Sequence, residues 1–206
     1  MIAGLLFLAF VYFAVGKAAV LRSGAQTAAD AAALGAAQEA RDQLREGWIE
    51  VIGDPAQWPL FVSGAFAVDS DLACERAADL AASNEAKVED CTATTLRFDV
   101  RVLTNGAVGD SIVPDTETQK ATATATAVIE PRCSFEVPTP TEEPGPTEEP
   151  EPTEEPTSTP SAEPEPEPEL IVGLTCDDEA ITIDPENPLL PDAGDLFRVR
   201  LTGDHE

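Results

Sequence analysis

The sequence is poor in basic residues and has a single histidine. Its 206 residues include 39 acidic and 12 basic side chains, which gives a net charge of −27. A surface with this excess of negative charge repels phosphate groups. The balance therefore argues against nucleic acid and against anionic lipid headgroups as partners. The one histidine, His205, is the penultimate residue, where a frayed terminus cannot orient a nucleophile.

The motifs that carry catalysis or metal binding are missing. The sequence has no GxSxG nucleophile elbow, no phosphate-binding loop, no HExxH motif and no CxxC spacing. Zinc sites need clustered thiolates or imidazoles, and the sequence offers none. Four aspartates could crowd around a calcium ion, but they lack EF-hand spacing and aspartate commonly occupies turns: Asp177, Asp178, Asp184 and Asp192. We therefore expect no enzyme activity, no cofactor, no metal and no small-molecule substrate.

The first 41 residues contain no proline and begin with a long apolar run. Residues 1–16 are almost entirely apolar, and this character continues through Val20 and Leu21 with only Lys17 interrupting. About twenty apolar residues are needed for a helix to cross roughly 30 Å of hydrocarbon. The sequence predicts a transmembrane anchor over residues 1–22, continuing outward as the same helix.

Small side chains dominate the continuation of this helix. Residues 25–46 carry strong helix formers at almost every position. Small residues let another helix approach closely, as they do at membrane helix interfaces. One reading is a face that packs against partner helices, and the other is a stalk helix solvated on both sides. The expected partner face consists of Gln26, Ala29, Asp30, Ala32, Ala33 and Ala36.

Residues 26–37, with the sequence QTAADAAALGAA directly behind an apolar helix, resemble the signature of the Tad (tight adherence) pilus-assembly proteins of the TadE/TadG-like group. The overall plan is similar to that of TadG-related proteins from high-GC Gram-positive bacteria. The resemblance implies a non-enzymatic, membrane-anchored component of a pilus-assembly or secretion system. Its partners would be the membrane and other Tad pilus-assembly proteins.

The hydrophobic period predicts an α+β ectodomain over residues 23–137. Asp69 or Ser70 can cap a second helix that runs to Ala81. Residues 94–103 alternate between polar and apolar side chains, which indicates a half-buried strand. Residues 119–130 alternate threonine with alanine and should pair with it in an antiparallel sheet, with the alanine face under a helix. A long helix, a second helix and a small antiparallel sheet is the plan of pilin-like proteins.

Residues 138–169 form a Pro/Thr/Glu-rich tract that repeats PTEEP and holds 11 prolines and 11 glutamates without a base. Such a composition predicts a disordered, extended linker. Its use could be that of a cell-wall spacer or a glycosylation target, or it could be an insertion of no specific use. Residues 170–206 predict a short C-terminal β segment, whose strands add to the first sheet or stay tethered by a disulfide. The expected strands cover residues 170–176, 180–183 and 196–201.

The four cysteines are Cys74, Cys91, Cys133 and Cys176. On an exported chain an even set predicts disulfides, and four cysteines allow three connectivities. Cys133 and Cys176 lie immediately before and after the Pro/Thr/Glu-rich tract, while Cys74 and Cys91 flank a short helical stretch. We favour these two pairs, because the Cys133–Cys176 bridge would tie the C-terminal segment back to the main fold.

Two signals conflict over the side of the membrane. Lys17 and Arg22 follow the anchor, and by the positive-inside rule they would hold the C-terminal side in the cytoplasm. The cysteines, the Pro/Thr/Glu-rich tract and the family resemblance place it outside. We expect a single-pass cell-membrane protein with its C-terminal bulk extracytoplasmic. The alternative function is a signal-anchored cell-surface adhesion or binding domain on a Pro-rich spacer.

Overall fold

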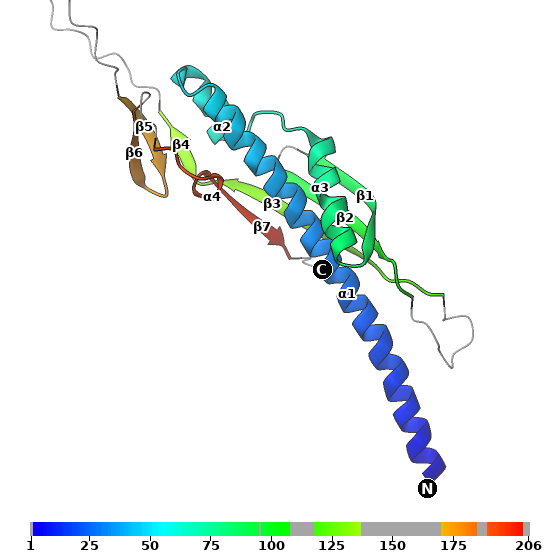
Figure 1. Ribbon diagram of the computed structural model, residues 1–206. Coiled ribbons are helices and arrows are strands. Elements are labelled where there is room, and N and C mark those ends of the chain that lie inside the picture. The colour runs from blue at the N-terminus through cyan, green and yellow to red at the C-terminus, as the bar shows by residue number, and fades with distance from the viewer. Residues whose placement is uncertain (1, 95, 108–117, 137–169, 185–188, 204–206) are drawn as a thin grey trace, which may run out of the picture.

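The computed structural model describes residues 2–94, 96–107, 118–136, 170–184 and 189–203. Its longest element is α1 (Ile2–Glu50), a continuous helix of 49 residues, about 74 Å long at 1.5 Å per residue. The N-terminal part of α1 projects away from the rest of the chain, and its C-terminal part packs against helices and strands (Figure 1). The expected continuous helix is confirmed.

The chain turns back after α1 through two short helical segments. The 3-10 turn η1 (Pro55–Gln57) and α2 (Trp58–Val62) each carry a proline in the first turn, where the missing N–H costs no hydrogen bond. The second long helix is α3 (Ser70–Ser83). The Asp69 carboxylate accepts the backbone N–H groups of Asp71 and Leu72 at 2.9 and 3.2 Å. The predicted cap and helix are therefore both present.

A four-stranded antiparallel sheet lies against α1 and α3. Its strands are β1 (Ala86–Thr94), β2 (Arg97–Thr104), β3 (Thr122–Pro131) and β7 (Phe197–Thr202), in the order β1-β2-β3-β7. Phe98 pairs with Ala127 and Val100 with Ala125, so the apolar positions of β2 and β3 share the face that packs on the helices. The pairing expected between residues 94–103 and 119–130 is confirmed. Strand β1 was not predicted.

The second sheet has three strands and lies at the end of the molecule far from the projecting part of α1 (Figure 1). It is formed by β4 (Cys133–Phe135), β5 (Ile171–Cys176) and β6 (Glu179–Ile183). The short helix α4 (Ala193–Leu196) leads from it into β7. The three expected C-terminal strands are thus present but divided, because β7 joins the first sheet while β5 and β6 pair with β4. The Pro/Thr/Glu-rich tract lies outside the described residues.

The core runs along the packed part of α1. It is lined by alanines from α1, α3 and β3 and by Phe98, Val100 and Val102 from β2. Larger aromatic side chains close it near the second sheet. The rings of Trp48 and Trp58 meet edge to face at 5.2 Å, and Trp58 lies 4.8 Å from the ring of Phe135.

Candidate functional site: the two halves of α1

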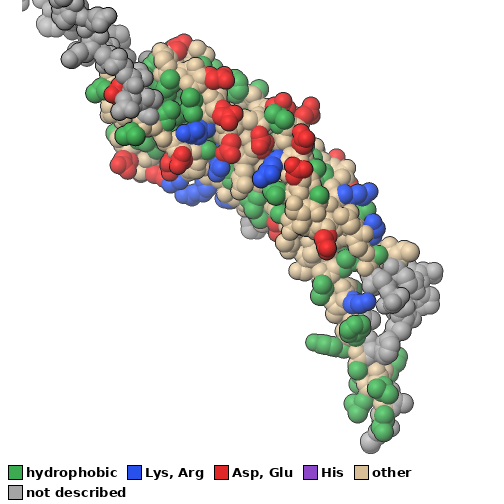
Figure 2. Space-filling view, in the orientation of Figure 1, with side chains coloured by type: hydrophobic (Ala, Val, Ile, Leu, Met, Phe, Trp, Pro, Cys, Tyr) green, Lys and Arg blue, Asp and Glu red, His purple; other side chains and the backbone are tan. Residues whose placement is uncertain are grey.

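The N-terminal half of α1, residues 2–21, carries large apolar side chains that contact almost nothing in the fold. Phe7 is 67% exposed and Tyr12 is 83% exposed. Figure 2 shows these hydrophobic side chains on the projecting end of the molecule, and acidic side chains over the packed part. Within the described part of the chain, α1 is the one helix long and apolar enough to cross a membrane by length and composition. Its most apolar 18-residue window has a mean hydropathy of 2.1 and is not buried.

The C-terminal half of α1 is enclosed by the protein itself. Four residues of the expected partner face have no exposed surface, because α3 covers one side of the helix and β2 and β3 cover another. These residues are Ala29, Ala32, Ala33 and Ala36. In this structure their surface is occupied by the chain's own helices and strands. The alternative of a stalk helix solvated on both sides is also wrong for these residues, because they are buried.

Gln26 and Asp30 are the members of the expected face that keep accessible side chains. Gln26 is exposed, Asp30 is half-buried, and the Gln26 amide donates a hydrogen bond of 2.8 Å to the Asp30 carboxylate. Both lie just beyond the apolar half of α1, where the helix enters the fold. They mark the boundary between the two halves.

The close approach of neighbouring elements to α1 depends on its smallest residues. A Cβ placed on Gly35 would lie 2.3 Å from Cδ1 of Leu80 on α3. A Cβ on Gly47 would lie 2.5 Å from Cε1 of Phe61 on α2. Glycine and alanine at these positions let α3 and α2 pack directly on the backbone of α1. The small-residue pattern predicts a contact between helices, and α1 makes such contacts with α3 and α2 of the same chain.

Two polar side chains near the C-terminal end of α1 hold segments that are distant in the sequence. Gln43 accepts the backbone N–H of Asp69 at 2.7 Å, which positions the start of α3. Arg45 donates through Nε to the carbonyl oxygen of Pro191 at 2.9 Å, a contact between segments 146 residues apart in the chain. Neither residue was singled out from the sequence, because a glutamine and an arginine on a helix carry no signal of long-range partners.

Both expected disulfides are present. Cys74 on α3 is bonded to Cys91 on β1, with 5.9 Å between their Cα atoms. Cys133 is bonded to Cys176, and the two residues face each other across the β4–β5 ladder with their Cα atoms 4.0 Å apart. The second bridge joins the chain on either side of the Pro/Thr/Glu-rich tract, as the sequence predicted.

The outer face of the four-stranded sheet is polar and internally paired. Arg97 donates to both carboxylate oxygens of Asp99 at 2.9 and 3.0 Å, and the hydroxyl of Thr126 donates to the same carboxylate. The hydrogen bonds from Arg97 lower the pKa of Asp99. Arg200 donates to Glu130 at 2.6 Å, which lowers the pKa of that carboxyl. Two arginines of this face are thus paired with carboxylates of the same sheet.

Three of the four aspartates considered as calcium ligands lie in a turn or at a helix cap. Asp177 and Asp178 have φ angles of 46° and 68° and form the turn between β5 and β6. Asp177 also pairs with Arg132, and this hydrogen bond lowers the pKa of the Asp177 carboxyl. Asp192 is the N-cap residue of α4. Within the described residues, no group of three or more His, Cys, Asp or Glu side chains could hold a metal ion.

Comparison with known families gives a match over most of α1. Residues 1–39 match the family model described as "Putative Flp pilus-assembly TadE/G-like". The TadE/G-like segment spans the whole apolar half and the first turns of the buried half. The family so described is a pilus-assembly family. No curated protein and no solved structure matches the chain.

Proposed function

We propose that this chain is a non-enzymatic, membrane-anchored component of a Tad-type (Flp) pilus-assembly or secretion system. The observation that carries the proposal is the TadE/G-like match over residues 1–39. It is supported by the character of that segment, in which exposed apolar side chains along residues 2–21 are followed without a break by the core helix of a folded ectodomain. A bilayer is the solvent that makes such exposed side chains stable. We further propose that the nearest relatives are TadG-related proteins of high-GC Gram-positive bacteria.

The ectodomain is proposed to lie outside the cytoplasm. All four cysteines are in disulfides, and disulfides persist in oxidising compartments but are rare in the cytosol. This supports a single-pass orientation with the C-terminal bulk extracytoplasmic. The basic residues Lys17 and Arg22 would then follow the anchor on the outer side.

Partner proteins are proposed to bind α1 at the boundary between its two halves. The alanines of the buried half are covered by α3 and the sheet, whereas Gln26 stays exposed and Asp30 half-exposed at the foot of the fold. A partner helix that rises from the membrane would meet these two side chains before it reaches the ectodomain. Of the six residues expected on the partner face, these two are the ones we retain for direct contact.

Membrane retention and crosslinking test the proposal. The full chain should stay in the membrane fraction through carbonate and high-salt extraction, because inserted apolar residues resist treatments that strip charge-based attachment. A photo-crosslinker at Gln26 should capture a co-expressed Tad pilus-assembly protein. The matched control is the same group at Gln38, which is also exposed on α1 but lies higher on the fold. Release by carbonate, or equal capture at both positions, would contradict the proposal.

A second candidate function is a cell-surface adhesion or binding domain carried on a Pro-rich spacer. It is favoured by the position of β4 and β5, which border the tract and lie at the end of the fold far from the anchor (Figure 1). Leu170 and Val172 there are 58% and 48% exposed. Deleting the gene separates the two functions. Loss of pilus assembly supports the first, and loss of surface binding with intact pili supports the second.

A further inference from the structure

We propose that residues 105–107 and 118–121, which follow β2 and precede β3, make a second contact with the membrane. They would lie in the phospholipid headgroup layer beside α1. The inference rests on the membrane anchoring proposed above. It adds that the ectodomain sits directly on the bilayer and is not held above it on a stalk.

The position of the hairpin along α1 carries the proposal. Ala107 follows the end of β2 by three residues and faces a shallow hollow on α1. The wall of that hollow is formed by Tyr12, Phe13, Gly16, Lys17, Val20 and Leu21. These residues belong to the apolar half of the helix. Figure 1 shows the hairpin ends of β2 and β3 reaching along α1 toward its N-terminus.

The length of the apolar half sets the level of the membrane surface. Residues 2–21 number 20 and rise by about 30 Å at 1.5 Å per residue, which matches the thickness of the hydrocarbon layer. If these residues span that layer, Leu21 lies at its border. The hollow that Ala107 lines extends along α1 from Leu21 to Tyr12, so Ala107 is then at the headgroup level or just inside the hydrocarbon border. Because α1 is one continuous helix packed against β2 and β3, the sheet cannot move away from this level independently.

The neck of the hairpin is suited to an environment with little water. Thr104 is the last residue of β2, and its side chain is buried. Its backbone N–H donates to the Ala121 carbonyl at 2.9 Å, its hydroxyl accepts the Ala121 N–H at 3.1 Å, and the same hydroxyl donates to the Gly106 carbonyl at 2.8 Å. Backbone polar groups that are already paired lose little free energy on entering the interface.

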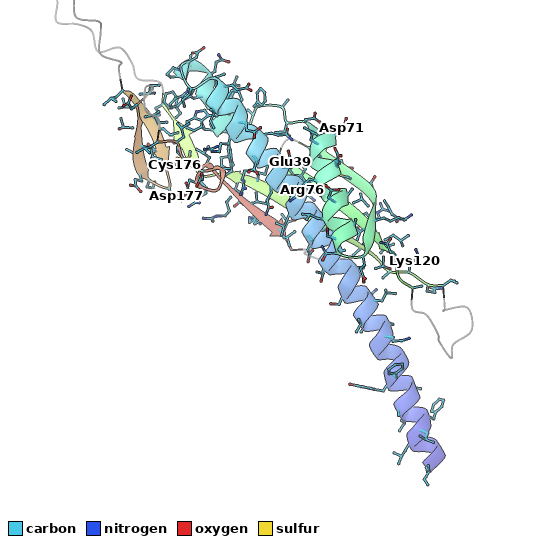
Figure 3. All side chains as sticks on the ribbon, viewed as in Figure 1. Glu39, Asp71, Arg76, Lys120, Cys176 and Asp177 are labelled. Carbon is cyan, nitrogen blue, oxygen red and sulfur yellow. A yellow bond between two sulfur atoms is a disulfide. The ribbon has the colours of Figure 1, made fainter. Side chains whose placement is uncertain are left out.

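The lysines of the chain gather at the same end. The sequence has three, Lys17, Lys87 and Lys120. Lys87 pairs with Leu103 near the end of β2, and Lys120 lies two residues before β3, at the foot of the sheet in Figure 3. Lysine stems lie along apolar surface while the ammonium group stays at the interface. Glu85 lies at this end as well, because its backbone carbonyl accepts the Asn105 N–H at 2.7 Å. The contact is thus imposed by the anchor and not by attraction of the acidic chain to charged lipid.

Site-directed spin labelling of the full-length protein in phosphatidylcholine nanodiscs tests the contact. Three variants each place one nitroxide on a former alanine: Ala9→Cys in the apolar half of α1, Ala107→Cys at the hairpin, and Ala56→Cys at the far end of the fold. All four native cysteines are in disulfides, so each label has a single free thiol. Non-reducing peptide mapping confirms in each variant that both native bridges remain. The readout is the ratio of collision rates with oxygen, which enriches in lipid, and with a water-soluble nickel chelate.

The ratio at Ala107 should be several-fold higher than at Ala56 and lower than at Ala9. A ratio at Ala107 equal to that at Ala56, with Ala9 still lipid-like, overturns the hairpin contact and leaves the anchor intact. A water-like ratio at Ala9 overturns the anchoring itself. The two failures are therefore distinguishable within one set of measurements.

Discussion

The two halves of α1 relate hydrophobicity to burial in opposite ways. The N-terminal half carries leucine, phenylalanine and valine side chains that are exposed, while the C-terminal half carries alanines with no exposed surface. In water the larger side chains would be the ones buried, because each contributes more apolar area. The inversion supports the proposal that lipid surrounds the first half. The protein's own helices and strands surround the second half.

Deleting the N-terminal half of α1 should have the largest effect, which is on membrane association. A chain that begins at Ser23 loses the exposed apolar residues but keeps every α1 residue that is buried in the core. We expect it to move entirely from the membrane fraction to the soluble fraction, and its circular dichroism spectrum to lose only the helical signal of the deleted residues. Fractionation by ultracentrifugation measures the first expectation. If the shortened chain still sediments with membranes, the ectodomain alone binds them. The N-terminal half of α1 would then not be what attaches the chain to the membrane.

The same substitution in each half should have opposite outcomes. Ala32→Leu with Ala36→Leu adds volume where α1 has no free surface, and overpacking of this kind costs about 1–3 kcal/mol at each site. Ala18→Leu with Ala19→Leu changes two exposed alanines of the apolar half and should leave stability unchanged. Thermal unfolding of both variants in detergent measures the difference. Equal melting temperatures would show that the alanines of the second half are not tightly packed.

Removing the Cys133–Cys176 disulfide should destabilise the protein more than removing the Cys74–Cys91 disulfide. Replacing Cys133 and Cys176 by serine opens a bridge with a sequence separation of 43, against 17 for Cys74 and Cys91. The chain-entropy estimate gives about 4 and about 3 kcal/mol for the two bridges. We expect the first double variant to unfold at the lower temperature, and to lose order first in the second sheet. Hydrogen exchange monitored by mass spectrometry locates that loss, and uniform exchange would contradict it.

Acid should have the smallest effect, confined to the outer face of the sheet. Hydrogen bonds from Arg97 and Arg200 lower the pKa values of Asp99 and Glu130. A carboxyl whose pKa is lower in the folded state stabilises the fold above its unfolded pKa, and this contribution is lost as the pH falls through the folded value. We therefore expect a modest loss of stability below about pH 4. The Arg97→Gln variant should show a shallower pH dependence of its melting temperature. An unchanged dependence would show that Asp99 does not contribute to the loss of stability in acid.

Local chemistry accounts for the elements that the sequence predicts correctly. The capping carboxylate of Asp69 and the alternation in β2 and β3 each specify an element through residues close together in the chain. Strand β1 escapes this reasoning because its register shifts between Val88 and Asp90. The irregularity interrupts the alternation by which a half-buried strand is recognised.

The sequence by itself predicted the continuous first helix, the capped second helix and the pairing of β2 with β3, because hydropathy, capping residues and alternation are local properties. It also favoured, among three possible connectivities, the two cysteine pairs that the structure contains. Only the tertiary structure decided what the alanines of α1 pack against. Small side chains can pack against α3 of the same chain or against a helix of a partner protein. They carry no information about which of the two helices packs there. The division of the C-terminal strands was decided in the same way, since the sequence marks β5 and β7 as strands but does not say that they pair with β4 and β3 in separate sheets.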